Sequence, residues 1–227
     1  MLGLVLALIA SEPSVTFERI ERDIEGRLEV HLAYPVFHGS TALTKFASEQ
    51  AKKSVIEQFE EFKSTVDVDN PPPNTGHVPL FRLTSVVSVV SWDLIAVFVE
   101  SYSDPGGAHG MMTRLPMNFG IVNGKPKKLL LADLLIEGAE PVDVVTNKLF
   151  PRLQEAKRKR GWERLWFTPE QQEKFVVTPA GLSWTFGDYD VGPYAEGGYI
   201  IKVPWSDLPV LDSLPERLKK GANAHRK

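Results

Sequence analysis

One long segment with a helical repeat stands among segments that alternate apolar and polar side chains. From Thr41 to Val66 the apolar residues recur every three or four positions, which is the pattern of an amphipathic helix. Ser40 or Thr41 is a candidate N-cap for this helix. Residues 28–34 instead place an apolar side chain at every second position, as a strand with one buried face requires. A chain with both repeats is expected to pack a helix against a sheet.

Further segments rich in Val, Ile, Phe and Tyr predict additional strands. The sequence Asn123-Gly124 predicts a tight hairpin turn. Residues 141–159 show a second helical repeat with Pro151 inside it, so a kink or two short helices are expected. The predicted strands are residues 14–23, 28–34 (closed by Pro35), 80–89, 94–103, 111–122, 128–131, 174–178, 182–186 and 199–204.

The order of these segments predicts the fold class. Strands and helices are mixed without the regular strand–helix–strand alternation of a parallel sheet. We therefore expect an α+β fold with antiparallel sheets and packed helices, arranged as two consecutive α+β subdomains. The expected divisions are a truncated signal segment at 1–10, an N-terminal domain at 11–103, a C-terminal domain at 104–220 and a polar tail at 221–227.

The first ten residues bear on the compartment. They are apolar and end in small residues, like the central part of a secretory signal. A short buried strand is the alternative. Because a membrane-spanning helix needs about 20 apolar residues, no spanning segment is expected here. We expect the protein to be exported to the periplasm, the cell surface or the medium.

The charge balance and the cysteine count exclude several classes of function. The chain has 26 basic and 29 acidic residues, and this near balance argues against a nucleic-acid partner. It has no cysteine, which excludes disulfides, thiolate metal sites and cysteine nucleophiles. One basic run, residues 157–160, has two interpretations. It either places cations at the negative end of a helix dipole or forms a patch for an anionic partner.

No sequence motif marks a catalytic or cofactor site. None of the five histidines is paired at a spacing typical of metal ligands. The G-x-S-x-G elbow, the P-loop and the dinucleotide-binding fingerprint are all missing from the sequence. We therefore expect no metal, no cofactor and no catalytic residue that local sequence identifies.

Two loops crowded with glycine and tyrosine are the candidate binding site, and they cover residues 102–110 and 186–198. Glycines allow close approach of the backbone to a ligand, and tyrosines offer flat amphipathic surfaces suited to sugars or proteins. The alternative is structural, with tight turns and with tyrosines that connect the loops to the core. The candidate ligand-binding residues are Tyr102, Gly106, Gly107, His109, Asp188, Tyr189 and Tyr194.

An ordered set of short motifs in the second half resembles a known family. The motifs are Gly106-Gly-Ala-His-Gly110, Asn123-Gly-Lys125, Leu131-Ala-Asp-Leu134, Gly192-Pro-Tyr-Ala195 and Val203-Pro204. Together they resemble the C-terminal domain of unknown function found in the RsiV anti-sigma factor and in the PdaC peptidoglycan deacetylase. Residues 15–101 are similar to the domain that precedes it in those proteins. Asp104-Pro105 depart from the family, which more often has a threonine before the two glycines.

The resemblance implies an exported α+β module at the bacterial cell envelope. The extracytoplasmic part of the RsiV anti-sigma factor binds lysozyme, and in PdaC the module accompanies a separate catalytic domain. We therefore expect a non-enzymatic binding module that recognises a cell-wall glycan or an extracellular protein such as lysozyme. The alternative is a hydrolase or transferase of envelope polysaccharide. It would use His109 with Asp188 or Glu196 as acid and base.

Overall fold

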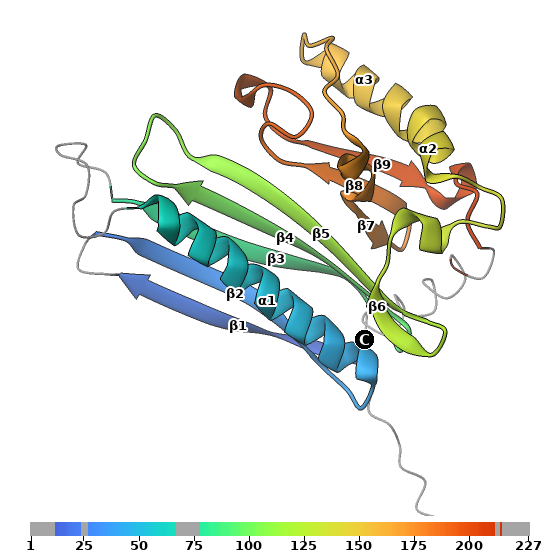
Figure 1. The fold of residues 1–227 in the computed structure, drawn as a ribbon, viewed down its shortest axis with the longest axis horizontal. Coiled ribbons are helices and arrows are strands. Elements are labelled where there is room, and N and C mark those ends of the chain that lie inside the picture. The colour runs from blue at the N-terminus through green and yellow to red at the C-terminus, as the bar shows by residue number, and fades with distance from the viewer. Residues whose placement is uncertain (1–11, 24–26, 67–77, 212–213, 215–227) are drawn as a thin grey trace, which may run out of the picture.

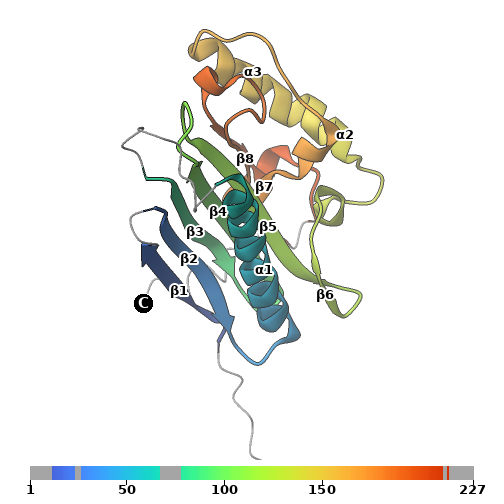
Figure 2. The same cartoon turned by 60° about the vertical axis from the view of Figure 1, so that its left-hand side comes forward.

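The computed structural model describes residues 12–23, 27–66, 78–211 and 214. The predicted signal segment 1–10 and polar tail 221–227 lie outside these described residues. The α+β fold class is confirmed, because a six-stranded and a three-stranded sheet, mostly antiparallel, pack with helices. A long helix covers one face of the larger sheet, and the smaller sheet with the second helical segment packs against the other (Figures 1 and 2).

The strands of the larger sheet follow one another in chain order. They are β1 (Ser14–Asp23), β2 (Glu29–His38), β3 (Leu80–Val90), β4 (Leu94–Asp104), β5 (Met111–Val122) and β6 (Lys125–Lys128). The smaller sheet holds β7 (Phe175–Thr178), β8 (Gly181–Phe186) and β9 (Tyr199–Pro204). The larger sheet continues across the predicted division at residue 104, because β5 pairs with β4 and β6 pairs with β5.

One strand pair departs from the antiparallel expectation, since β2 and β3 run parallel. Parallel neighbours need a crossover connection, and the helix α1 (Ala42–Thr65) lies in it. Thr41 caps this helix by accepting a hydrogen bond from the Thr44 amide at 3.1 Å, as one of the two predicted caps. The apolar face of α1 packs on the sheet and forms the first core with residues such as Leu43, Val55 and Phe81.

Two strands differ from prediction by more than one residue. Strand β2 runs through Pro35 to His38, with Pro35 opposite Phe17 of the neighbouring strand, so the proline does not end it. Strand β6 begins directly after Asn123-Gly124 rather than at residue 128. Asn123 and Gly124 have positive φ angles of 52° and 75°, as a two-residue hairpin turn requires. Strand β6 can therefore pair with β5 directly after the turn.

The second helical segment bears out the expected interruption near Pro151. Helix α2 (Pro141–Val144) continues through a π-helical turn at Val145–Leu149 into α3 (Phe150–Lys159). Pro151 lies in the first turn of α3, where its missing amide hydrogen costs least. Neither these helices nor α1 is long and apolar enough to cross a membrane, within the described part of the chain.

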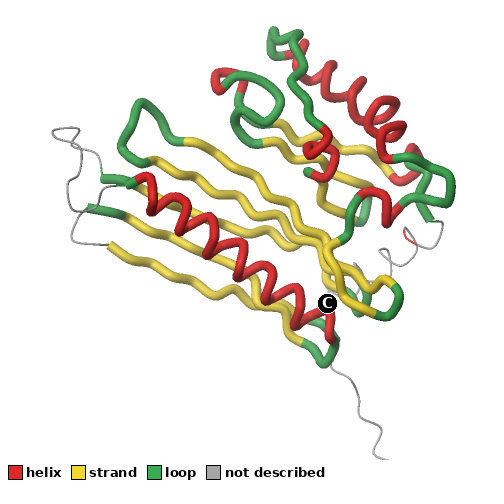
Figure 3. The backbone as a smooth tube through the Cα atoms, in the orientation of Figure 1, coloured by secondary structure: helices red, strands yellow, loops and turns green. Residues whose placement is uncertain are grey.

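A second core joins the two sheets. It contains residues of the smaller sheet and of α2–α3 together with Val89, Leu94 and Ala96 from the larger sheet. The buried side chain of Asn118 in β5 donates to the carbonyl of Phe175 and accepts from the amide of Val177, each at 2.8 Å. The Asn118 side chain thus forms the hydrogen bonds to β7 that a neighbouring strand would otherwise form. Figure 3 shows the backbone of the two sheets that this residue connects.

Candidate functional site

The two candidate loops meet in space at His109 and Tyr194, although 85 positions separate these residues in the sequence. The His109 ring, in the loop between β4 and β5, stacks on the Tyr194 ring with centroids 3.7 Å apart and planes 18° apart. Tyr189 lies on the same loop as Tyr194, and these two ring centroids are 5.8 Å apart. We call His109, Tyr194 and Tyr189 the aromatic stack.

The members of the aromatic stack differ in exposure. His109 is exposed, Tyr189 is 48% exposed and Tyr194 is partly buried. Because His109 covers a face of Tyr194, that face is closed to a ligand. Tyr189 has the looser, tilted contact at 35° and projects into solvent. The aromatic surface most open to a ligand is therefore Tyr189, with His109 exposed beside it.

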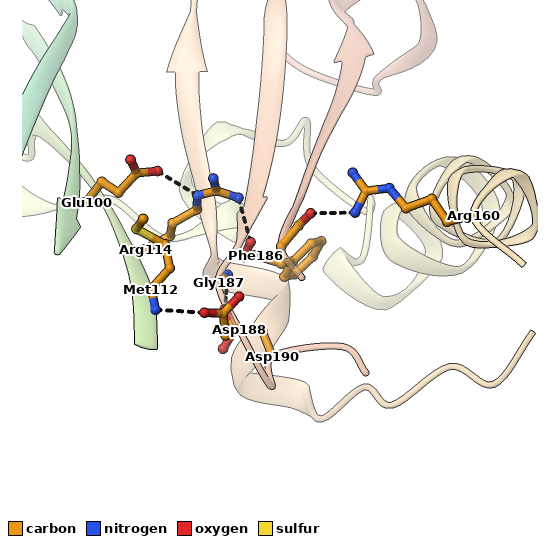
Figure 4. A network of polar contacts seen from close by, with 9 residues as sticks. Glu100, Met112, Arg114, Arg160, Phe186, Gly187, Asp188 and Asp190 are labelled. Atoms are coloured by element: carbon orange, nitrogen blue, oxygen red, sulfur yellow. Dashed lines mark hydrogen bonds and ion pairs between the residues drawn. The ribbon is translucent and has the colours of Figure 1, made fainter. Parts of the chain in front are cut away.

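Backbone contacts hold the second loop against β5. The Met112 amide donates to the Asp188 carboxylate at 2.8 Å, and the Asp188 amide donates to the Met112 carbonyl at 2.8 Å (Figure 4). Asp188 thus closes a reciprocal pair of hydrogen bonds between segments far apart in the sequence. Asp188, which the sequence predicts to bind a ligand, therefore holds the loop that carries Tyr189 and Tyr194 against β5.

Arg114 adds a second connection between the same segments. Its Nε donates to Glu100 on β4 at 2.9 Å, and its Nη1 donates to the carbonyl of Phe186 at the end of β8 at 2.9 Å (Figure 4). Its side chain is mostly buried, so these charge-assisted bonds are stronger than an exposed pair of the same kind. The end of β8 is therefore fixed just where the Tyr189 loop begins.

Gly187 allows this close approach. A Cβ atom there would overlap the Met112 carbonyl oxygen, a backbone atom that cannot rotate away. We expect Gly187→Ala to lower the free energy of unfolding by about 1–3 kcal/mol, since the loop would have to move off β5. Urea unfolding would measure the loss. Gly107→Ala is the matched control, because a Cβ there meets nothing within 4 Å, and an equal loss in both variants would contradict the assignment.

The second loop is also braced from within. Asp190 forms an ion pair with Lys174 and accepts a hydrogen bond from the Gly187 amide at 2.7 Å. Between these fixed points Tyr189 adopts φ of +64°, which is uncommon for a bulky residue. The strained backbone holds an aromatic side chain out into solvent.

The first loop is shaped by Tyr102 and Asp104. Asp104 accepts from the Gly106 amide at 3.0 Å, and the Tyr102 hydroxyl donates to Asp104 at 3.3 Å. Burial, followed by the nearby Asp104 charge, raises the pKa of the Tyr102 phenol. A Cβ on Gly110 would overlap the Tyr102 ring, so these residues turn the chain toward His109. Gly107 stands exposed at the tip.

A buried ion pair fixes the segment on either side of Tyr194. Glu196 pairs with Lys157 of α3, and both side chains are almost fully buried. Lys157 also donates to the Val191 carbonyl at 2.7 Å, and Tyr199 donates to Glu196 at 2.7 Å. Burial, followed by this hydrogen bond, raises the pKa of Tyr199 to about 12. The first member of the basic run is therefore neither a solvated dipole partner nor part of a surface patch.

The last member of the basic run also contacts the second loop. The Arg160 guanidinium lies over the Tyr199 ring, with its central carbon 4.2 Å from the ring centroid. It donates to the carbonyls of Glu196 and Gly198 at 3.1 and 3.0 Å, and Figure 4 shows it reaching from the helix to the loop. The end of α3 thus clamps the residues that follow Tyr194.

A cavity of about 340 Å³ opens beside His109, between the C-terminal half of α1 and the sheet. Its lining includes the rings of Phe62 and Phe81, stacked at 5.0 Å, and the hydroxyl groups of serine and threonine residues. The lining residues are Gln58, Glu61, Phe62, Thr65, Phe81, Ser101, Ser103, Pro105, His109, Met111 and Thr113.

The alternative function, a hydrolase or transferase, would need His109 close to the carboxylate of Asp188 or Glu196. The Asp188 carboxylate accepts from the Met112 amide, and the buried Glu196 carboxylate is held by Lys157 and Tyr199. Within the described residues neither is paired with His109, whose Nδ1 lies 3.0 Å from the Gly110 carbonyl oxygen. Nor do the described histidines and carboxylates gather into a group able to hold a metal ion.

Sequence reasoning selected the members of the stack but missed what supports them. In the sequence, Lys157 is one of four consecutive cations, and Glu196 is a candidate only as a catalytic acid or base. Neither position indicates the ion pair that the two residues form. Arg114 and Glu100 carry no local signal, because their contact depends on the register of β4 and β5, where they are direct partners. The signal available for Glu196 was an acid between a tyrosine and two glycines in an otherwise apolar region.

Comparison with known proteins extends these observations. Residues 132–206 match the model of a family described as a protein of unknown function, DUF3298. No curated protein matches the chain in sequence. Two solved structures share the fold, each with a TM-score of 0.56: a DUF3298 family member from Bacteroides fragilis and a DUF3298 family protein from Pseudomonas aeruginosa.

The first is 17% identical and covers 93% of this chain and 98% of its own; the second is 18% identical and covers 86% and 91%. The expected domain of unknown function is confirmed at this level, and its link to the RsiV anti-sigma factor and PdaC stays a prediction. The chain thus carries a DUF3298 match from the helical turn after β6 to the helical turn after β9, within a fold similar to that of solved DUF3298 family proteins.

Proposed function

We propose that this protein is an exported, non-enzymatic binding module that recognises a cell-envelope glycan through the aromatic stack. The observation that carries the proposal is Tyr189, held in a strained left-handed conformation with its ring in solvent. Strained residues cluster at ligand sites, where the surrounding structure maintains them. Asp188, Asp190 and Arg114 supply that surrounding structure here.

A glycan suits the chemistry of this surface. The exposed ring of Tyr189 offers an apolar face to the C–H groups of a sugar, while the polar His109 ring stacks on the adjacent Tyr194. The Asp188 carboxylate stands next to Tyr189 in sequence and is only partly buried. An aromatic face flanked by groups that form hydrogen bonds is typical of orienting sites for polar ligands. The alternative ligand is an extracellular protein such as lysozyme, and the binding test below distinguishes it from a glycan.

Loss of the exposed ring tests the proposal. We expect Tyr189→Ala to weaken binding of soluble peptidoglycan fragments about tenfold, which corresponds to the upper end of one aromatic contact. Isothermal titration calorimetry would measure this affinity, with lysozyme titrated in parallel. His109→Ala should also weaken binding, because Tyr194 loses the ring that supports it.

The matched control is Trp92→Ala, which removes an aromatic side chain of similar exposure, 42%, in the turn between β3 and β4. This variant should bind as the wild type does. If glycan fragments fail to bind the wild type while lysozyme binds it, the ligand is a protein. If neither binds and His109→Ala lowers only the melting temperature, the aromatic stack is structural and the proposal fails.

A further inference from the structure

The two outer edges of the six-stranded sheet differ in protection. Strand β6 is four residues long, with the sequence Lys-Pro-Lys-Lys. Short length, proline and lysine are among the features that keep a sheet edge from pairing with another chain. Strand β1 has ten residues and contains no proline, lysine or glycine. Its five charged residues oppose pairing with a strand of unmatched charge, so only a strand with complementary charges fits this edge.

Strand β1 is also regular along its whole length. All ten of its residues pair with β2, from Ser14 opposite His38 to Asp23 opposite Glu29, with no bulge. Within the described part of the chain, β2 is its hydrogen-bonded neighbour, and β1 forms the margin of the sheet in both views (Figures 1 and 2). The outward-directed backbone groups of β1 therefore form a straight, exposed template for another strand.

The order of charges in β1 identifies the strand that fits. We propose that a second copy of this chain adds its own β1, antiparallel, around a two-fold axis that passes at Ile20. Because the axis is perpendicular to the sheet, the α1-covered face of one copy continues into the α1-covered face of the other. Residues at equal distances along the chain from Ile20, one from each copy, lie directly opposite each other. Glu18 then lies opposite Arg22 of the second copy, and Arg19 lies opposite Glu21. Opposite charges at facing positions stabilise an antiparallel pair.

Neighbouring registers lack this complementarity. An axis at Arg19 or Glu21 sets that residue against its own copy, and like charges directly opposite are destabilising. An axis at Glu18 or Arg22 has the same fault. An axis at Phe17 sets Arg19 opposite Val15 and Glu18 opposite Thr16, so no charge meets its counterpart. Among two-fold axes perpendicular to the sheet at the centre of the strand, only the one at Ile20 gives every charge next to the axis an opposite partner.

Packing agrees with this register. Ile20 is partly buried and contacts the first core, on the side of the sheet that α1 covers. Two such residues meeting at the axis would extend this apolar layer from one copy into the next. Two paired strands bury less than a standard interface of about 1,600 Å², so the expected dissociation constant is on the order of micromolar.

The test uses the full chain and a charge exchange. Sedimentation velocity across a concentration series should show a monomer–dimer equilibrium for the wild type. Arg19→Glu should weaken the dimer about tenfold, because two like-charged pairs arise by symmetry, and Glu21→Arg should do the same. The double variant Arg19→Glu/Glu21→Arg restores both opposite pairs and should restore the wild-type constant.

Both residues are exposed, so the single variants should keep the wild-type melting temperature. Lys125→Glu on the opposite edge is the matched control and should leave association unchanged. A wild type that stays monomeric at every concentration overturns the proposal. Single variants that dimerise as tightly as the wild type overturn the register, and a double variant that fails to recover overturns the pairing of Arg19 with Glu21.

Discussion

Lys157→Met is expected to lower the free energy of unfolding by about 3–5 kcal/mol, because it leaves the Glu196 carboxylate charged and buried without its cation. One oxygen of that carboxylate, Oε2, already has no hydrogen-bond partner within the described residues. Methionine keeps most of the side-chain volume, so the loss reports the charge and its hydrogen bond to the Val191 carbonyl rather than a cavity. Urea unfolding followed by tryptophan fluorescence would measure it.

The double variant Lys157→Met/Glu196→Leu separates the ion pair from the packing. Replacing both charges with apolar groups of similar size is often neutral, so it should recover most of the stability. A single variant as stable as the wild type at neutral pH would show that Glu196 reaches solvent.

Asn118→Leu is expected to destabilise the protein by about 3 kcal/mol, since two buried backbone groups, the Phe175 carbonyl and the Val177 amide, would lose their partner. Leucine has a similar shape, so the loss would again report hydrogen bonding. Thermal and urea unfolding would give the free energy, and hydrogen exchange at Val177 would show where the structure opens.

Asn147→Ala is the control for this substitution, because it removes an exposed amide from the segment between α2 and α3. Its effect should stay within about 0.5 kcal/mol. If Asn118→Leu costs no more than Asn147→Ala, the smaller sheet does not depend on the side chain of Asn118. Faster exchange confined to β7 would instead agree with a local role at the junction of the sheets.

Most of the secondary structure followed from periodicity. The helix at 42–65 and the long strands have repeats long enough to outweigh single residues, and Asn123-Gly124 marked its turn. The parallel pairing of β2 with β3 did not follow, because alternation along a strand says nothing about the direction of its neighbour. Pro35 was misleading for a related reason. A missing amide ends a strand only where that amide would have been needed for pairing.

The candidate site was predictable in its residues and not in its support. Glycines and tyrosines at 102–110 and 186–198 marked both loops, and the structure brings His109 and Tyr194 into contact. Their approach depends on the smaller sheet lying against β5, which is a tertiary arrangement. Lys157 was misread because a cation at the end of a helix is usually solvated. The matching acid lies 39 residues further along the chain, at Glu196.

The amide bridge from Asn118 limits where this chain could be cut. A fragment trimmed to 132–206 would omit Asn118 and also Val89, Leu94 and Ala96, which close the second core. Strand β7 would then expose both its backbone and its apolar side chains, which favours aggregation over independent folding. We therefore expect the segment shared with the sequence family not to fold on its own, and a fragment that folds independently to retain the strands that precede it.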